Sequence, residues 1–187
     1  MFLGSFRITP RLLNYTAVRG FKVFTPALFK IGDTIPTGLK GIYESSPGND
    51  VDIGKEVTNG KFIIVGVPAA FSPACSSAHV PGFINLLDDF KAKGISQVLI
   101  TCVNDPFVTK AWASQLNCPP DLRILADTQG EFAKAAGKLF DSKKIFGNER
   151  SSRYALIVKD GKVLNQFLEP DKIGLKFSTA ETVLSAL

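Results

Sequence analysis

The cysteine at position 75 lies in a local sequence typical of a reactive thiol. It follows Phe71-Ser72-Pro73-Ala74, in which Ser72 is a good N-cap and Pro73 a good first residue of a helix. Cys75 is therefore expected in the first helical turn, where free N–H groups and the helix dipole favour an anion. Thiols in such places can have a pKa of roughly 3.5–7.5 instead of about 8.5. Cys75 is the candidate nucleophile, and a buried, inert cysteine is the alternative that local sequence leaves open.

The residues around Cys75 limit the kind of thiol chemistry. Residues 75–78 read Cys-Ser-Ser-Ala, so the C-x-x-C dithiol of a disulfide isomerase is absent and a thiol that reacts with a small oxidant is favoured. His79, the only histidine, lies on the same helix face; it could polarise the thiol or be an ordinary polar residue at the helix edge. A cysteine hydrolase needs a histidine from elsewhere in the fold, so that class is not expected.

The remaining cysteines and two arginines complete the set of candidate groups. Cys102 is expected in the core of a strand, and Cys118, before two prolines, in a more exposed loop. The spacing of the three cysteines and His79 does not suit a metal ion, so no metal site is expected. Arg150 and Arg153 flank two serines before a strand, where an arginine can point at a thiolate or an oxyanion. Position alone does not separate that role from a solvated surface charge.

The elements that must hold these groups alternate along the chain. Strands are expected at 61–67, 97–103 and 122–126, and a hairpin at 153–168 around Asp160-Gly161. Helices are expected at 73–93, after the N-cap Asp105, after a capping box of Thr128 with Glu131, and after Ser178 with Glu181. Residues 31–60 suggest turns and short strands. This order predicts an α/β protein with a mixed central sheet covered by helices on both faces, as in a thioredoxin-like fold.

The charge of the chain is concentrated at its N-terminal end. The formal net charge of the 187 residues is +5, yet from Asp33 onward 17 basic residues balance 17 acidic ones. Nucleic-acid binding is therefore not expected, and no apolar run is long enough to span a membrane. Residues 1–29 have the composition of a mitochondrial presequence and a lead-in, with cleavage near residue 21 and import into the matrix; a disordered basic tail is the alternative. The final Ser185-Ala186-Leu187 resembles a weak peroxisomal signal, so a peroxisomal or cytosolic pool stays open.

Several spaced motifs resemble one family. Pro68 to Cys75 match P-x-x-x-[ST]-x-x-C, the active-site motif of peroxiredoxins. The continuation through residues 76–83, together with residues 103–108, 111–112, 145–148 and 153–154, resembles the atypical type-5 and plant type-II branch. The resemblance covers about residues 30–187, which we therefore expect to form one thioredoxin-like domain.

The resemblance implies a thiol-dependent peroxidase that needs no metal or organic cofactor. It implies that Cys75 is the peroxidatic cysteine, oxidised to a sulfenic acid by hydrogen peroxide or organic hydroperoxides. It also implies that Pro68 shields the thiol, that Ser72 and Arg153 donate hydrogen bonds, and that the protein serves antioxidant defence as a homodimer. A non-enzymatic redox sensor or partner-binding protein on the same fold is the competing hypothesis.

The chain departs from the family in the step that regenerates the thiol. Some type-5 members carry a resolving cysteine where this sequence has Phe177, and plant type-II members place a second cysteine where it has Ile100. Either an external thiol (glutathione with glutaredoxin, or thioredoxin) reduces Cys75 directly, or Cys102 or Cys118 resolves it. We favour the one-cysteine cycle.

Overall fold

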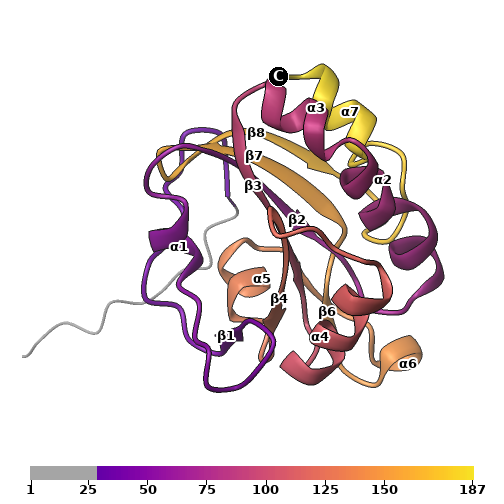
Figure 1. Ribbon diagram of the computed structural model, residues 1–187. Coiled ribbons are helices and arrows are strands. Elements are labelled where there is room, and N and C mark those ends of the chain that lie inside the picture. The colour runs from indigo at the N-terminus through magenta and orange to yellow at the C-terminus, as the bar shows by residue number, and fades with distance from the viewer. Residues whose placement is uncertain (1–28) are drawn as a thin grey trace, which may run out of the picture.

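The computed structural model describes residues 29–187, so the predicted presequence and its cleavage site lie outside the described residues. A six-stranded sheet has the order β1-β4-β3-β2-β7-β8. Strands β2, β3 and β4 run parallel, whereas β1, β7 and β8 each pair antiparallel with their neighbour (Figure 1). The bounds are β1 Ile42–Tyr43, β2 Lys61–Gly66, β3 Ile95–Cys102, β4 Leu122–Asp127, β7 Tyr154–Lys159 and β8 Lys162–Leu168. The predicted mixed α/β sheet is confirmed.

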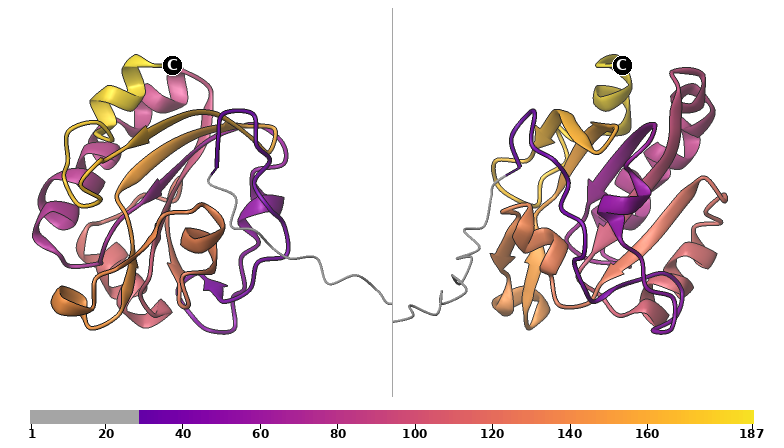
Figure 2. Two further views of the ribbon diagram at one scale, coloured as in Figure 1. Left: turned by 180° about the vertical axis from the view of Figure 1, so that it is seen from behind. Right: turned by 90° about the vertical axis from the view of Figure 1, so that its left-hand side faces the viewer.

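Apolar side chains that alternate along the strands build a core on each face of the sheet. Ile63 and Val65 point to one face, and Phe62 and Ile64 to the other. The first face is covered by α2 Val80–Asn85, α3 Leu87–Ala92, α4 Pro106–Gln115 and α7 Ala180–Ser185, and the second by α1 Ile53–Glu56 and α5 Glu131–Ala135. Figure 2 shows these two groups of helices on opposite sides of the sheet.

The β7–β8 hairpin forms as the Asp-Gly dipeptide predicts. Asp160 and Gly161 both have positive φ, 48° and 75°, as a two-residue turn of this kind requires. Antiparallel pairing of β7 with β2 brings Tyr154 opposite Gly66, at the end of β2 that leads toward Cys75. A Cβ at Gly66 would overlap the Tyr154 ring, so only glycine allows this close approach. The residue before Tyr154 is thereby held near the end of β2.

The helix predicted at 73–93 is interrupted twice. Residues Cys75–His79 form a π-helical turn, η1, in which the Val80 N–H bonds the Cys75 carbonyl. Pro81 has no N–H for the Ser77 carbonyl and its ring crowds that turn, which explains the wider turn. A second break at Leu86, with φ −101° and ψ 14°, separates α2 from α3 without a glycine or proline to signal it.

The helix caps predicted for α5 and α7 are wrong, because in each case the serine or threonine has a better partner elsewhere. Helix α5 begins after Gly130, and the Asp127 carboxylate accepts hydrogen bonds from the Phe132 and Ala133 N–H groups. Thr128, predicted as the cap, instead donates its hydroxyl to the Gly41 carbonyl. At α7 the cap is Thr179, and Ser178 donates its hydroxyl to Glu169.

Short elements that sequence periodicity does not reveal lie outside the main sheet. They are α1, the two-stranded sheet of β5 Leu139–Asp141 with β6 Glu149–Ser151, and α6 Lys143–Phe146 between them. The helix expected after Thr128 therefore ends at Ala135, before β5 begins. No helix within residues 29–187 is long and apolar enough to cross a membrane.

Candidate active site

Cys75 is fully buried at the start of the π-helical turn. The turn begins one loop after β2, and the Ser76 N–H donates to the Ser72 carbonyl at 2.9 Å. The Cys75 side chain belongs to the core on the α2 face of the sheet. It is therefore held in one place, so any group beside the sulfur must come from the surrounding elements.

Arg153 reaches the sulfur from the neighbouring strand. Its Nη1 donates to the Cys75 Sγ at 3.4 Å, and its Nε donates to the Ile173 carbonyl at 3.1 Å. The residue directly precedes β7 and is only 2% exposed. The structure therefore distinguishes the two candidate arginines, because Arg150 donates to the Val103 carbonyl and lies over the Phe146 ring instead.

His79 contacts the arginine and not the thiol. Its Nε2 lies 2.8 Å from the Ser178 carbonyl and its Nδ1 lies 3.0 Å from Arg153 Nη1. Because a carbonyl and a guanidinium nitrogen fix the roles, Nε2–H donates to Ser178 and Nδ1 accepts from Arg153. Burial, and then the Arg153 charge, lower the pKa of His79 to about 4. A neutral, buried imidazole that holds Arg153 replaces both sequence-based interpretations of this histidine.

Ser72 and Pro68 lie in the loop that joins β2 to the Cys75 turn. The half-buried Ser72 donates its hydroxyl to the Ala69 carbonyl at 2.9 Å and does not cap the helix through its side chain, contrary to the sequence prediction. Its oxygen keeps lone pairs that can accept a further hydrogen bond. Pro68 is buried two residues after the end of β2.

The other two cysteines are placed where thiolates do not form easily. Cys102 is fully buried at the end of β3, and burial raises the pKa of its thiol far above the ordinary range. Cys118 is half-buried beside a hollow of about 170 Å³, and burial raises the pKa of its thiol to about 11. Both thiols are therefore protonated at neutral pH.

Three contributors to the site were missed by sequence reasoning. The Trp112 indole Nε1 donates to the Ser76 hydroxyl at 2.9 Å and so braces the Cys75 turn from α4. Ser178 accepts from His79, and Glu169 in turn holds Ser178. Of these three, only Trp112 could have been noticed in the sequence, as the single tryptophan on an expected helix. The roles of Ser178 and Glu169 depend on contacts between segments far apart in the chain.

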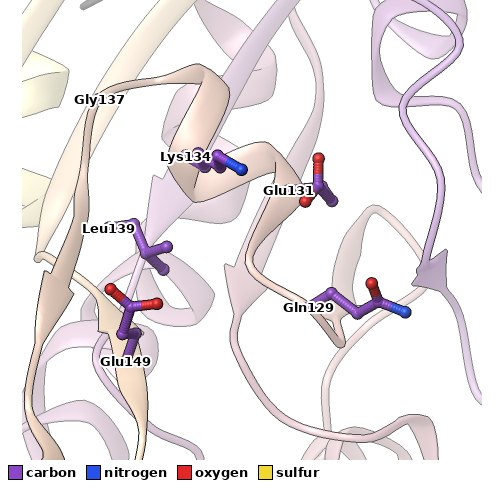
Figure 3. Close-up of a pocket in the computed structure, with 6 residues that line it drawn as sticks. All are labelled: Gln129, Glu131, Lys134, Gly137, Leu139 and Glu149. Atoms are coloured by element: carbon purple, nitrogen blue, oxygen red, sulfur yellow. The ribbon is translucent and has the colours of Figure 1, made fainter. Parts of the chain in front are cut away.

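Two hollows formed by the described residues lie away from Cys75. One of about 380 Å³ is lined by residues of α5 and the β5–β6 sheet, among them Glu131, Lys134 and Glu149 (Figure 3). A second, of about 390 Å³, shares Gln129 and Glu131 with it and extends along the chain before β1. Within residues 29–187 there is no cluster of three or more His, Cys, Asp or Glu side chains that could hold a metal ion. We therefore identify the candidate site by its side-chain contacts.

Comparison with known proteins agrees with this geometry. The redoxin family profile matches residues 30–184. The chain is 42% identical to "Peroxisomal membrane associated protein 20" of Schizosaccharomyces pombe, over 84% of this chain and 98% of that protein. It is 39% identical to "Peroxiredoxin-2C" of Oryza sativa subsp. japonica, over 84% and 97% of the two chains.

Solved structures give the same result. Reduced Prx3 of Vibrio vulnificus in complex with hydrogen peroxide superposes with a TM-score of 0.77 at 36% identity, over 85% of this chain and 99% of that one. Peroxiredoxin 5 of Alvinella pompejana superposes with a TM-score of 0.74 at 36% identity, over 84% and 97%. These neighbours confirm the thioredoxin-like fold. The chain therefore belongs to the redoxin family, and within it to the peroxiredoxins of the type-5 and plant type-II branch, which are thiol peroxidases.

Proposed function

We propose that this protein reduces hydrogen peroxide and alkyl hydroperoxides through Cys75. The Cys75 thiolate attacks one peroxide oxygen, the O–O bond breaks, and the other oxygen leaves as water or alcohol after gaining a proton. Cys75 becomes a sulfenic acid. The observation that carries this proposal is the hydrogen bond from the buried Arg153 guanidinium to the Cys75 sulfur.

The groups around the sulfur suit the charge that develops in this reaction. Arg153 stabilises the thiolate and then the departing oxygen, since its fork has donors to spare. Ser72 is the polar side chain of the loop before Cys75. Because its own proton goes to the Ala69 carbonyl, its oxygen would accept the proton of a bound hydroperoxide. Pro68, buried after β2, shields the sulfur side of the loop from water. This acceptor role replaces the sequence-based expectation, in which Ser72 was a donor.

Regeneration would use an external thiol. The sulfenic acid reacts with one thiol to give a mixed disulfide and water, and a second thiol then releases Cys75 and carries away the disulfide. The burial and raised thiol pKa of Cys102 and Cys118 support this cycle over an internal resolving cysteine. Glutathione with glutaredoxin, or thioredoxin, would supply the electrons, and the protein would act as a homodimer in antioxidant defence.

We also infer an organellar location. The acid-free, arginine-containing stretch before Asp33 favours mitochondrial import. The name of the fission yeast relative favours the peroxisome for that protein. In this chain Leu187, the last residue of the signal-like tripeptide, packs partly against the core, which weighs against its use as a free C-terminal signal. Imaging a fluorescent fusion with and without residues 1–28 would distinguish the two organelles.

The test of the proposed activity is direct. The second-order rate constant with hydrogen peroxide should be abolished by Cys75→Ser and retained by Cys118→Ser, its matched control. Mass spectrometry after one equivalent of peroxide should find one added oxygen on Cys75. The proposal fails if Cys75→Ser keeps near-normal turnover, or if peroxide is consumed no faster than by a free thiol, as for a non-enzymatic sensor.

A further inference from the structure

The segment of residues 169–178, between β8 and α7, closes around Arg153. The Lys172 carbonyl accepts from the Arg153 N–H at 2.6 Å, and the Ile173 carbonyl accepts from its Nε at 3.1 Å. The Arg153 carbonyl in turn accepts from the Glu169 N–H at 3.3 Å. The segment thus holds both the main chain and the guanidinium of the arginine that contacts the thiol.

Glu169 is the centre of this segment. Its Oε1 accepts hydrogen bonds from the N–H groups of Lys176, Phe177 and Ser178 and from the Ser178 hydroxyl, at 2.7–2.9 Å. The side chain is buried, and burial alone would raise its pKa, yet these four hydrogen bonds lower the pKa of Glu169 below its ordinary value. An ionised carboxylate with four donors is a strong restraint, since charge-assisted hydrogen bonds are about twice as strong as neutral ones.

The restraint on Ser178 continues to the thiol through two side chains. Ser178, held at its N–H and hydroxyl by Glu169, presents its carbonyl to His79 Nε2 at 2.8 Å. That bond fixes which imidazole nitrogen carries the proton, so Nδ1 is free to accept from Arg153 Nη1. The same Nη1 donates to the Cys75 sulfur.

We propose that Glu169 is a positioning residue for the peroxide reaction, acting through the Ser178 carbonyl and His79 to hold Arg153 against Cys75. The inference rests on the proposed function, in which Arg153 stabilises the reacting sulfur and oxygen. Within residues 29–187 no carboxylate makes an ion pair with Arg153, so Glu169 orders the arginine without neutralising it. An acid placed directly against the guanidinium would compete with the thiolate for the same donors.

The sequence supplies two spectroscopic reporters for the test. The chain has one histidine and one tryptophan, so one imidazole and one indole N–H signal are expected in an NMR spectrum. The imidazole signal reports the His79–Ser178 bond, and the indole signal reports the Trp112–Ser76 bond on the Cys75 turn. In Glu169→Ala the imidazole signal should shift and exchange faster with water, whereas the indole signal should stay. The matched control is Glu181→Ala, an exposed glutamate in the first turn of α7, which should change neither.

The kinetic arm uses the same proteins. Glu169→Ala should lower the second-order rate constant with hydrogen peroxide on the order of tenfold to 100-fold, the cost of a group displaced by about 1 Å. In a His79→Ala background the same change should have little further effect, because both act on one contact. Glu169→Asp keeps the charge but shortens the side chain, so it should give smaller changes of both readouts in the same direction, and it carries the test if Glu169→Ala does not fold.

The outcomes separate this inference from the proposed function. An unchanged imidazole signal in a folded Glu169→Ala protein overturns the link from Glu169 to His79, even if Cys75 proves to be the nucleophile. A shifted imidazole signal with an unchanged rate constant overturns the positioning role. If instead Cys75→Ser retains activity, the proposed function fails, and the positioning role with it, although the imidazole signal still tests the structural link.

Discussion

Two arginines in this protein are held by several hydrogen bonds, but their partners differ in charge. Arg123, on β4, donates to the carboxylates of Glu44 and Glu56 at 2.8 Å each and also to Gln97. Arg153 donates to a main-chain carbonyl, a neutral imidazole and a thiol. Arg123 is thus neutralised by two acids, whereas no side chain in contact with Arg153 does so unless Cys75 ionises.

This difference explains how one residue type serves both structure and chemistry. Arg123 joins β4, β3, α1 and the loop after β1, so its charge is used up in holding elements together. Arg153 is fixed equally well, yet its positive charge stays available for a thiolate or a departing oxygen. The carboxylate nearest to it in function, Glu169, is turned toward N–H groups of residues 176–178.

The largest effect is expected when the positive charge of Arg153, which no acid among residues 29–187 neutralises, is removed. Arg153→Ala should lower the second-order rate constant with hydrogen peroxide by about 10²–10³, the cost of losing a donor to a developing oxyanion. Arg123→Ala should leave that rate unchanged, and Arg150→Ala should have a smaller effect than Arg153→Ala. Stopped-flow measurements across pH would check this. Equal, small effects for Arg150 and Arg153 would show that neither acts on the thiol.

The second prediction concerns pH and stability. Because burial, and then Arg153, lower the pKa of His79 to about 4 from 6.5, the unfolded chain binds a proton there more readily than the folded one. Between pH 6.5 and 4 this group therefore removes stability as the pH falls, on the order of 3 kcal/mol in total. Above pH 6.5 His79 does not make the free energy of unfolding depend on pH.

A second buried group opposes this slope. Burial raises the pKa of Asp127 from 3.8 to about 6, so its ionisation removes stability as the pH rises through that window, by a similar amount. The wild type should thus show a shallow dependence, and Asp127→Asn should reveal the histidine slope. Urea unfolding at pH 4.5, 5.5 and 6.5 measures it. A variant whose stability stays flat over this range would show that His79 is not neutral and buried as described.

The neutralised arginine should matter for stability instead of rate. Arg123→Ala should lower the free energy of unfolding by about 1–3 kcal/mol, because it leaves the partly buried Glu44 and the more exposed Glu56 without their partner. Added salt should weaken the ion pairs of the wild type and so narrow the difference. Urea unfolding at low and high sodium chloride tests this, and an unaffected stability would contradict the structural role.

The sequence predicted the strands and helices that carry this site better than the side-chain hydrogen bonds within it. The strands and the hairpin follow from local patterns, namely β-branched runs and an Asp-Gly turn, which need no distant partner. The motif and the resemblance pointed to Cys75 and to Arg153. Position alone did not distinguish Arg150 from Arg153. The difference arises because the start of β7, directly after Arg153, pairs with Gly66 at the end of β2 that leads to Cys75.

The parts that were not predicted depend on particular side-chain contacts, some of them local and others between segments far apart in sequence. The π-helical turn forms because Pro81 lacks an N–H and crowds the preceding turn. The cap of α5 comes from Asp127, the last residue of β4, whose carboxylate accepts from the Ala133 N–H. Glu169 has no local signal at all, because its role is defined by the loop that it gathers and by His79 beyond it. Such acceptors of several hydrogen bonds can be found only once the fold is known.

The smallest expected effect comes from the two other cysteines, and it tests whether Arg153 serves a one-cysteine cycle. A disulfide with Cys75 needs Cα atoms within about 7 Å and an exposed, reactive thiolate. Cys102 is buried in β3, and Cys118 lies beyond the end of α4; burial keeps both thiols protonated. We expect such a disulfide to require local unfolding of the Cys75 turn, although Trp112 and Arg153 both hold that turn.

We therefore expect Cys102→Ala and Cys118→Ala, singly and together, to keep the peroxidase rate with glutathione and glutaredoxin. Cys102→Ala leaves a small gap in the core, so its unfolding free energy should fall while its rate does not. Non-reducing mass spectrometry after one equivalent of peroxide provides the decisive measurement. A stoichiometric Cys75–Cys102 or Cys75–Cys118 disulfide, with turnover lost in the matching variant, would mean that the turn opens during catalysis. In that case the hydrogen bond from Arg153 would have to break in every cycle, and its charge would serve only the first step.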